Sequence, residues 1–221
     1  LHRLPKKPFR ILDIPGLEDD FYTNFLDWSL KNQIAICLDN KVYIHDYASG
    51  VTDELYEAFE CEAVSSLGFS PTGDKLAFGN LLGEVFVYDV ETKSEIHKFS
   101  CHSDRIGCID WKDPGFVTGS KDRTAIFTDP REKVKKPNVV CTHSQEICGV
   151  KMNNQMNLLA TGGNDNKVGV WAFGEGKKLM TGRHASGVKA LAWSHRQYGV
   201  LATGGGTNDR TLKIWNTSSV L

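Results

Sequence analysis

Three residue types that could together carry out proton transfer occur at a fixed spacing in the second half of the chain. His143, Thr161 and Asp165 have the composition of a base, a nucleophile and an orienting carboxylate, the set that many hydrolytic enzymes use. The same residue types recur in two further sets, His102, Thr118 and Asp122, and His184, Thr203 and Asp209. Because an active site is not repeated three times along one chain, we interpret these sets as structural. A buried aspartate needs donors, and a neutral histidine that donates to it orders both side chains.

The three histidines are 41 residues apart, which indicates an internal repeat. One series of large side chains has steps of 41, 42, 41 and 41 residues and comprises Trp28, Phe69, Trp111, Met152 and Trp193. A second series has steps of 43, 39, 44 and 44 residues and comprises His45, Tyr88, Phe127, Trp171 and Trp215. Two independent series with a period near 42 residues indicate five successive repeats.

Each repeat is divided into short apolar runs by turn-forming residues. In the fourth repeat the runs ICGVKM, LLATGG and KVGVW are separated by NNQMN and NDN. Short runs joined by Asn, Asp and Gly are typical of antiparallel strands, and no segment longer than ten residues has a helical period. A period of about 40–45 residues with roughly four strands is that of the WD-repeat propeller blade. The sequence therefore predicts an all-β, WD40-type β-propeller.

The repeats divide the chain into an N-terminal segment, residues 1–23, and a propeller, residues 24–221. We place five blades at approximately 24–62, 63–102, 103–143, 144–184 and 185–221, the fifth with residues for only three strands. In the last three blades the His, Thr and Asp sets should form hydrogen-bonded chains, which Trp171 and Trp215 complete in the last two. The first two blades lack the set and should rely on packing. An open propeller has unpaired strand edges, so we expect further C-terminal sequence or a partner chain to cover them.

Composition excludes several classes of partner. The formal net charge of −1 provides no electrostatic footprint for a nucleic acid. No apolar run approaches the length of a membrane span. The six cysteines contain no C-x-x-C pair and match no zinc or disulfide framework, so we expect small buried thiols, no metal and no cofactor.

Several stretches are more specific than a generic propeller and closely resemble the Fizzy/Fizzy-related family, the propeller coactivators of the anaphase-promoting complex. They are PFRILDIPGLEDDFYTNFLDWS (8–29), HSQEICGVKMN (143–153), LLATGGNDNKVGVW (158–171), GVKALAWS (187–194) and LATGGGTNDRTLKIWN (201–216). The resemblance covers nearly the whole chain and implies a seven-bladed ring, of which about five blades are present. It does not distinguish the Fizzy branch from the Fizzy-related branch.

The resemblance also implies a function. Members recruit substrates to the anaphase-promoting complex ubiquitin ligase by binding KEN-box and destruction-box degrons, and so promote degradation of cell-cycle proteins. The implied partners are subunits of that complex, contacted through elements outside this chain, degron-bearing substrates such as cyclins, and spindle-checkpoint proteins. The implied localisation is nucleus and cytoplasm.

The family match assigns five residues to a KEN pocket on the top face, near the central channel. Asn164 and Asn166 match two turn asparagines, whose amides suit the Glu and Asn side chains of a KEN peptide. Thr207 matches a pocket threonine, and Asp20 matches an acid placed for the peptide lysine. Phe21 stands where the family often has Tyr, so the ring is kept and a hydroxyl is lost. The alternative for the two asparagines is turn chemistry alone.

The destruction-box groove is implied between the first and last blades. Leu12 matches a residue lining the pocket for the motif's leucine, and Asp13 matches the acid that pairs with its arginine. The groove's other wall and an arginine of the KEN pocket belong to the last two blades, so both sites are expected to be incomplete here. FRILD (9–13) would, in the family, close the ring as the outer strand of the last blade. The alternative for Asp13 and Asp20 is a solvated acidic loop.

Two other classes of function remain as alternatives. One is a generic WD-repeat scaffold or a substrate receptor of another ubiquitin ligase, because FTDPR (127–131) resembles the Asp-x-Arg end of a cullin-ligase docking motif. Binding of a free KEN peptide would separate it from a degron receptor. The other is an enzyme, but the chain has no G-x-S-x-G, H-E-x-x-H or Walker motif, and we predict no catalytic activity.

Overall fold

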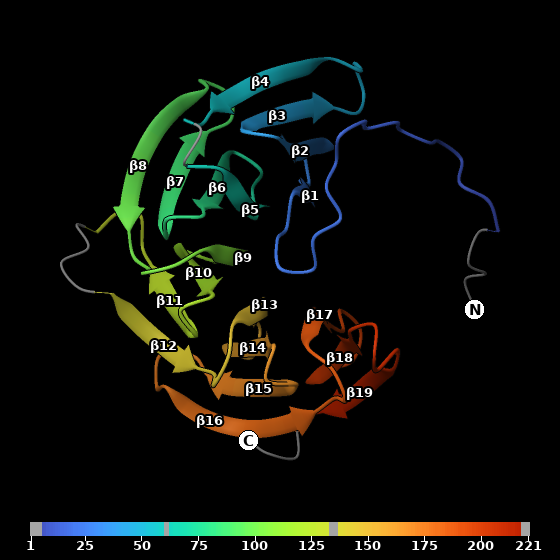
Figure 1. Cartoon of the computed structure of the whole chain (residues 1–221), viewed down its shortest axis with the longest axis vertical. Coiled ribbons are helices and arrows are strands. Elements are labelled where there is room, and N and C mark those ends of the chain that lie inside the picture. Colours follow the sequence, from blue (N-terminus) through green and yellow to red (C-terminus); the bar gives the residue numbers. More distant parts are fainter. Residues whose placement is uncertain (1–5, 60–61, 133–136, 218–221) are drawn as a thin grey trace.

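The computed structural model describes residues 6–59, 62–132 and 137–217 and contains 19 strands in five antiparallel sheets. Figure 1 shows the sheets as blades around a common axis, with the first strand of each blade innermost. No helix occurs in these ranges, and hence none that could cross a membrane. The predicted all-β propeller is confirmed.

The strands follow the chain outward through each blade before the next blade begins. Blade 1 comprises β1 (Leu26–Trp28), β2 (Gln33–Leu38), β3 (Lys41–Asp46) and β4 (Thr52–Glu57), and blade 2 comprises β5 (Val64–Phe69), β6 (Lys75–Asn80), β7 (Glu84–Asp89) and β8 (Ser94–Ser100). Blade 3 comprises β9 (Ile106–Lys112), β10 (Gly115–Ser120), β11 (Thr124–Thr128) and β12 (Asn138–Thr142). Blade 4 comprises β13 (Ile147–Asn153), β14 (Leu158–Gly163), β15 (Lys167–Ala172) and β16 (Lys177–Arg183). Blade 5 has three described strands, β17 (Val188–Trp193), β18 (Val200–Gly205) and β19 (Leu212–Asn216).

Apolar clusters lie between successive blades and hold them face to face. The first tryptophan series adds a polar link between blades. The Trp111 indole Nε1 donates to the Gly68 carbonyl of blade 2 at 2.7 Å, and the Trp193 indole Nε1 donates to the Lys151 carbonyl of blade 4 at 3.0 Å. The repeat therefore places each of these indoles against the backbone of the preceding blade. Trp28 holds the same repeat position in blade 1 but is 51% exposed.

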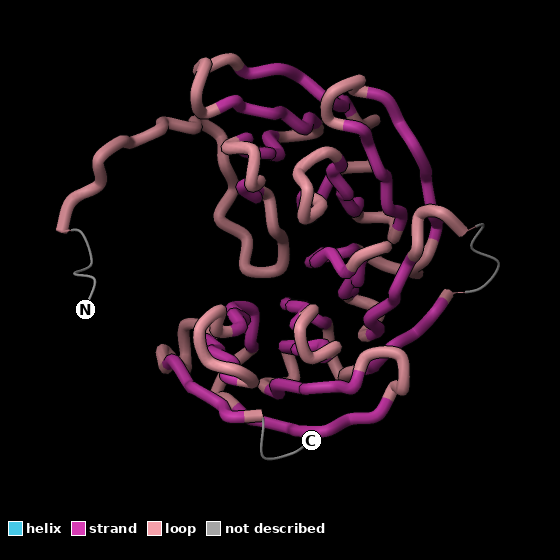
Figure 2. The backbone as a smooth tube through the Cα atoms, turned by 180° about the vertical axis from the view of Figure 1, so that it is seen from behind, coloured by secondary structure: helices cyan, strands magenta, loops and turns pink. Residues whose placement is uncertain are grey.

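The five blades form an open arc. Blades 1 and 5 are its two ends, and the N-terminal segment enters between them and reaches toward the centre (Figure 2). Blade 5 exposes Leu212 and Ile214, at 71% and 61%, whereas the corresponding face of β15 in blade 4 is buried. The difference arises because β15 is covered by the neighbouring blade and β19 is not.

The hydrogen-bonded chains form in blades 3 to 5. In blade 4, His143 Nδ1 donates to the Asp165 carboxylate at 3.0 Å, Thr161 Oγ1 donates to His143 Nε2 at 2.8 Å, and Trp171 Nε1 donates to Thr161 Oγ1 at 2.9 Å. Because a carboxylate only accepts, the histidine proton lies on Nδ1. Burial raises the pKa of Asp165, but hydrogen bonds from His143 and Ser144 outweigh burial, so its pKa lies below the ordinary value.

Blades 3 and 5 repeat this arrangement. The distances in blade 5 are 2.5 Å for His184–Asp209, 2.7 Å for His184–Thr203 and 2.8 Å for Trp215–Thr203. In blade 3 the His102–Asp122 and His102–Thr118 distances are both 2.8 Å, and Phe127 leaves that chain without an indole. Each of these hydrogen-bonded side-chain sets therefore links the turn after the second strand to the residue that begins its blade.

Blade 2 uses a different side chain at its turn. Buried Asn80 accepts hydrogen bonds from the backbone amides of Leu82 and Glu84 at 3.0 and 2.8 Å through its Oδ1. The stacked rings of Phe78 and Phe86, 5.3 Å apart, provide the packing that the sequence predicted for the first two blades. Packing is therefore supplemented by a side-chain turn bond that the sequence did not reveal.

Candidate functional site

The candidate site lies on the upper face, which is the face that carries the turns between the second and third strands of each blade. Residues 18–24 form a loop across this face, here called the strap. At one end Asn24 pairs with blade 2, donating its amide to the Ser65 carbonyl at 2.9 Å and accepting from the Leu67 amide at 3.0 Å. At the adjoining residue, the Lys189 ammonium of β17 in blade 5 donates to the Thr23 carbonyl at 2.5 Å. The strap is therefore held by both halves of the open arc.

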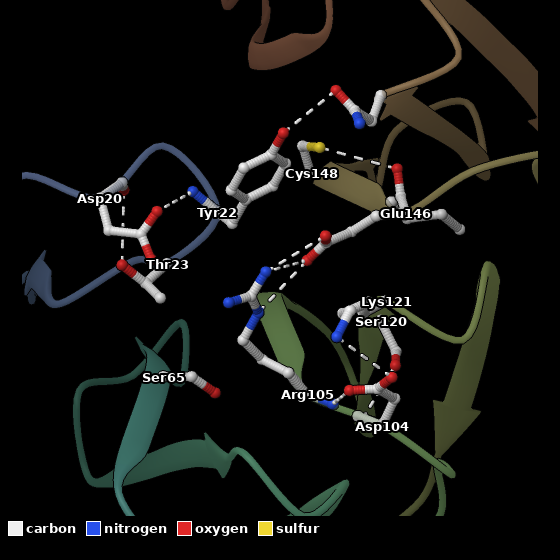
Figure 3. A network of polar contacts seen from close by, with 12 residues as sticks. Asp20, Tyr22, Thr23, Ser65, Asp104, Arg105, Ser120, Lys121, Glu146 and Cys148 are labelled. Atoms are coloured by element: carbon white, nitrogen blue, oxygen red, sulfur yellow. Dashed lines mark hydrogen bonds and ion pairs between the residues drawn. The ribbon is translucent and has the colours of Figure 1, made fainter.

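Tyr22 places the strap against blades 3 and 4 (Figure 3). Its hydroxyl donates to the Asn164 Oδ1 at 3.4 Å, and its ring lies 5.3 Å from the Arg105 guanidinium. Arg105 makes a two-pronged contact with the half-buried Glu146 carboxylate, at 2.9 and 3.2 Å from Nη2. The structure thus brings Asn164 together with the strap through residues from three separate elements.

Phe21 lies beside two glycines of blade 5. A Cβ added to Gly187 would lie 3.4 Å from the Phe21 ring, and one added to Gly206 would lie 3.5 Å from it. Phe21 and Tyr22 pack edge to face, with ring centroids 5.2 Å apart. The ring of Phe21 therefore connects the region of Asn164 with the turn that carries Thr207.

Asn166 and Thr207 occupy neighbouring turns of this face. Asn166 has a φ of +64°, and Arg123 and Arg210 adopt the same left-handed backbone at the equivalent positions of blades 3 and 5. Since asparagine tolerates this conformation readily, its place in the turn has a structural reason. Thr207 is exposed, and its carbonyl accepts from Arg210 Nε at 2.8 Å. Its side chain is left available on the surface of the turn.

Asp20 lines an acidic pocket of about 500 Å³ between the strap and blades 1 to 3. Its Oδ1 accepts from the Tyr22 amide at 2.9 Å, and Glu18 and Asp39 line the same pocket. Cys37 also lines the pocket, and burial together with the charges of Glu18 and Asp39 raises its pKa to about 12. The pocket therefore has the charge that suits a lysine side chain.

Leu12 and Asp13 lie elsewhere, against blade 1. They line a pocket of about 290 Å³ whose other walls include Ile36 and Tyr43. Asp13 is exposed and has no ion pair within the described ranges. His45 also lines this pocket, and its Nε2 is buried without a hydrogen-bond partner in the described part of the chain. The pocket is apolar with one unsatisfied polar atom.

The segment FRILD (9–13) forms no strand in the structure. Phe9 and Ile11 are 92% and 80% exposed, while Arg10 lies over the Tyr47 ring at 4.6 Å from its centroid. Its ring-closing role stays a prediction, because the blade that it would complete is not part of this chain.

The profile of the CDC20/Fizzy WD40 domain matches residues 12–220. The chain belongs to the CDC20/Fizzy family.

Two relatives and one solved structure show how far the likeness within this family extends. WD repeat-containing protein srw1 of Schizosaccharomyces pombe is 40% identical over 97% of this chain and 39% of its own length. APC/C activator protein CDH1 of Saccharomyces cerevisiae is 38% identical over 98% of this chain and 38% of its own length. A chain of the crystal structure of the mitotic checkpoint complex is 35% identical with a TM-score of 0.91, over 99% of this chain and 68% of that chain. The CDC20/Fizzy chain described here thus spans about half or less of the length of its curated relatives.

Sequence reasoning missed four participants in this CDC20/Fizzy site, namely Tyr22, Arg105, Glu146 and Lys189. The repeat contains a signal for two of them. Arg105 and Glu146 stand 41 residues apart, immediately before the first strands of blades 3 and 4. Equivalent positions in adjacent blades are neighbours, so opposite charges there should pair. Tyr22 and Lys189 had no such signal, because the path of the strap does not follow from the repeat.

Proposed function

We propose that this chain is the substrate-binding propeller of an activator of the anaphase-promoting complex, and that its upper face binds KEN-box degrons. Support comes from relatives named as an APC/C activator and as fizzy-related proteins. The structural neighbour in a mitotic checkpoint complex supports checkpoint proteins as further partners. Under this proposal the protein acts in the nucleus and cytoplasm.

The observation that carries the proposal is the arrangement around the strap. An asparagine amide held by Tyr22 lies next to the strap, and an acidic pocket lies on the strap's other side. A Lys-Glu-Asn peptide offers a cation, a carboxylate and an amide in order. The acidic pocket suits the lysine, and the Asn164 amide and the Thr207 hydroxyl suit the polar groups that follow.

The destruction box would bind at the pocket lined by Leu12 and Asp13. The apolar lining suits a leucine side chain, and exposed Asp13 is available for an arginine. The last two blades would complete this groove, so we expect the KEN site to be the stronger of the two in this chain. Substrates such as cyclins would be recognised through these motifs.

A binding role also agrees with the structural use of the triad-like residues His143, Thr161 and Asp165. The Thr161 hydroxyl is fully buried and bonded to both His143 and Trp171, so it is not available to attack a substrate. We therefore propose no catalytic activity for this chain. A receptor of another ubiquitin ligase would share the fold but would have no need of the strap's contacts with Asn164.

The test is a titration of a fluorescent KEN peptide against the chain, followed by anisotropy. We expect saturable binding that is lost with a scrambled peptide and with Asn164→Ala. Asn166→Gly retains the left-handed backbone and removes the amide together with its 3.4 Å hydrogen bond to the Ala185 carbonyl, so a loss of binding at unchanged stability separates degron contact from turn chemistry. Absence of binding by the native chain at any soluble concentration would contradict the proposal.

A further inference from the structure

We propose that the cavity in the central channel holds a primary ammonium group of a ligand on the Asp27 carboxylate of blade 1. The ligand is an alkylammonium, supplied either by a lysine side chain of a peptide or by a free polyamine. This site is separate from the turns that the proposed function uses, and it does not depend on degron binding. It follows from an ion pair that the repeat forms completely between blades 3 and 4 and only in part between blades 1 and 2.

Blades 3 and 4 contain the complete form of this ion pair. The Asp110 carboxylate of β9 accepts from the Met152 amide of β13 through Oδ2 at 2.7 Å, and the Lys151 ammonium donates to its Oδ1. The Asp110 side chain is only 15% exposed, so its charge is largely withdrawn from solvent. A carboxylate at this repeat position therefore uses one oxygen to join two blades and the other to hold an ammonium group.

The junction between blades 1 and 2 repeats half of this arrangement. Asp27 is equivalent to Asp110, and its Oδ2 accepts from the Phe69 amide of β5, also at 2.7 Å and with the same separation of 42 residues between the partners. The residue equivalent to Lys151 is Gly68, which has no side chain to donate. Asp27 forms no ion pair in the described part of the chain. Its second carboxylate oxygen is therefore left for a cation from outside the chain.

Asp27 lines a cavity of about 520 Å³ between the innermost strands. Two lysines line the same cavity, but the Lys151 ammonium is paired with Asp110 and the Lys189 ammonium is bonded to two carbonyls of the strap. Burial raises the pKa of Asp110, Lys151 lowers it, and the charge of Asp27 raises it again, so the two carboxylates repel each other within the cavity. A cation bound at Asp27 would relieve this repulsion.

Apolar side chains next to Asp27 suit the alkyl part of the ligand. Trp28 and Leu30 line the cavity and are 51% and 86% exposed. Trp28 lies against Tyr47, with ring centroids 5.5 Å apart, whereas the equivalent indoles of blades 3 and 5 donate to the preceding blade. An exposed indole can cover the methylene stem of an ammonium held by Asp27. A metal cation has no such stem, so this lining favours an alkylammonium.

Gly68 also provides the sharpest variant. A Cβ added to Gly68 would lie 3.4 Å from the Ile109 carbonyl oxygen and 3.7 Å from Ile109 Cγ2, which are ordinary contact distances. The backbone of Gly68 is not left-handed, so a side chain causes no strain there. By the repeat, Gly68→Lys supplies Asp27 with the ammonium that Lys151 supplies in blade 4, and it should close the site to ligands.

The experiment titrates the whole ¹⁵N-labelled chain, at constant ionic strength, with spermidine and with the peptide acetyl-Gly-Lys-Gly-amide. The backbone amide resonance of Phe69 reports on Asp27, because it donates to that carboxylate. The Met152 amide is the matched reference, because the carboxylate that it donates to is already paired. The Phe69 resonance should shift saturably and the Met152 resonance should not. The same peptide with its lysine acetylated carries no charge and should shift neither.

Three variants test the assignment of the site to Asp27. Asp27→Asn keeps an acceptor for the Phe69 amide but removes the charge, and it should weaken binding about 10- to 100-fold, the effect of one hydrogen bond to a charged group. Gly68→Lys should abolish the Phe69 response. Lys151→Gly creates a second copy of the site in blades 3 and 4, so the Met152 resonance should then respond to the probes as well.

A response to spermidine alone supports the site and identifies a free polyamine as the source, and a response to the peptide alone identifies a lysine side chain. The proposal is overturned if neither probe shifts the Phe69 resonance at millimolar concentrations. It is also overturned if Asp27→Asn binds the probes as tightly as the native chain, or if a folded Gly68→Lys does so. These two variants decide the outcome even where Lys151→Gly does not fold.

Discussion

Replacing Thr161 with valine tests the structural interpretation of the triad-like residues. Valine has nearly the same shape but lacks the hydroxyl that donates to His143 Nε2 and accepts from Trp171 Nε1. Thr161 is fully buried, so both partners would lose their hydrogen bond with little access to water. At ~1–3 kcal/mol for each buried unsatisfied group, Thr161→Val should lower the free energy of unfolding by roughly 2–6 kcal/mol.

Thr118→Val in blade 3 is the matched control, because the Thr118 hydroxyl lies 2.8 Å from His102 Nε2 and 3.3 Å from the Ile126 carbonyl but has no indole partner. It should lower the free energy of unfolding by about 1–3 kcal/mol. The larger loss expected for Thr161→Val is then the contribution of the hydrogen bond from the Trp171 indole. Urea unfolding, followed by circular dichroism and tryptophan fluorescence, measures both values. The reasoning is refuted if the two variants are equally destabilised, or if Thr161→Val loses less stability than Thr118→Val.

Three further predictions follow from the same contacts. The turn carboxylates of Asp122, Asp165 and Asp209 have pKa values below the ordinary 3.8. Their contribution to stability is therefore present above about pH 4 and is lost as the pH falls through their lowered folded-state pKa values. Urea unfolding at pH 7, 5 and 3 should show the free energy of unfolding falling only at the lowest pH, and a steady loss from pH 7 would contradict this. The five described cysteines are buried, and burial raises the pKa of the thiols, to about 12 for Cys148. The native protein at neutral pH should therefore resist alkylation by iodoacetamide until urea is added. Rapid labelling of any of the five in the native protein would be inconsistent with the fold. Trp193→Phe removes the indole hydrogen bond to the Lys151 carbonyl and should speed amide hydrogen exchange in β17–β19 by about 5- to 100-fold. Trp28→Phe, at the exposed equivalent position of blade 1, should have almost no effect on exchange. Equal effects of the two variants would show that the indole bond does not stabilise blade 5.

The blade architecture could be predicted because it repeats. The period near 42 residues reflects contacts between neighbouring blades, such as the indole bonds of Trp111 and Trp193 to the preceding blade, and the His, Thr and Asp sets recur with it in blades 3 to 5. Local rules sufficed there, since each strand pairs with its neighbour in the chain. The three described strands of blade 5 agree with the same count.

The candidate site was less accessible because it does not repeat. Asn164, Asn166 and Asp20 were found only through family resemblance, and the left-handed backbone of Asn166 shows why residue type alone left turn chemistry open. Tyr22 reaches Asn164 across 142 positions of sequence, a contact set by the path of the strap. No period predicts such a contact. It depends on tertiary placement of a loop that has no regular structure of its own.

The central claim is that the strap and the turns of blades 4 and 5 form one peptide-binding face. The most direct test is hydrogen–deuterium exchange of the chain with and without a saturating KEN peptide. The account predicts slower exchange confined to residues 18–24, 163–167 and 204–210, and none of this protection with a scrambled peptide. Protection on the lower turns of the blades alone, or no protection under conditions where the peptide is bound, would contradict it.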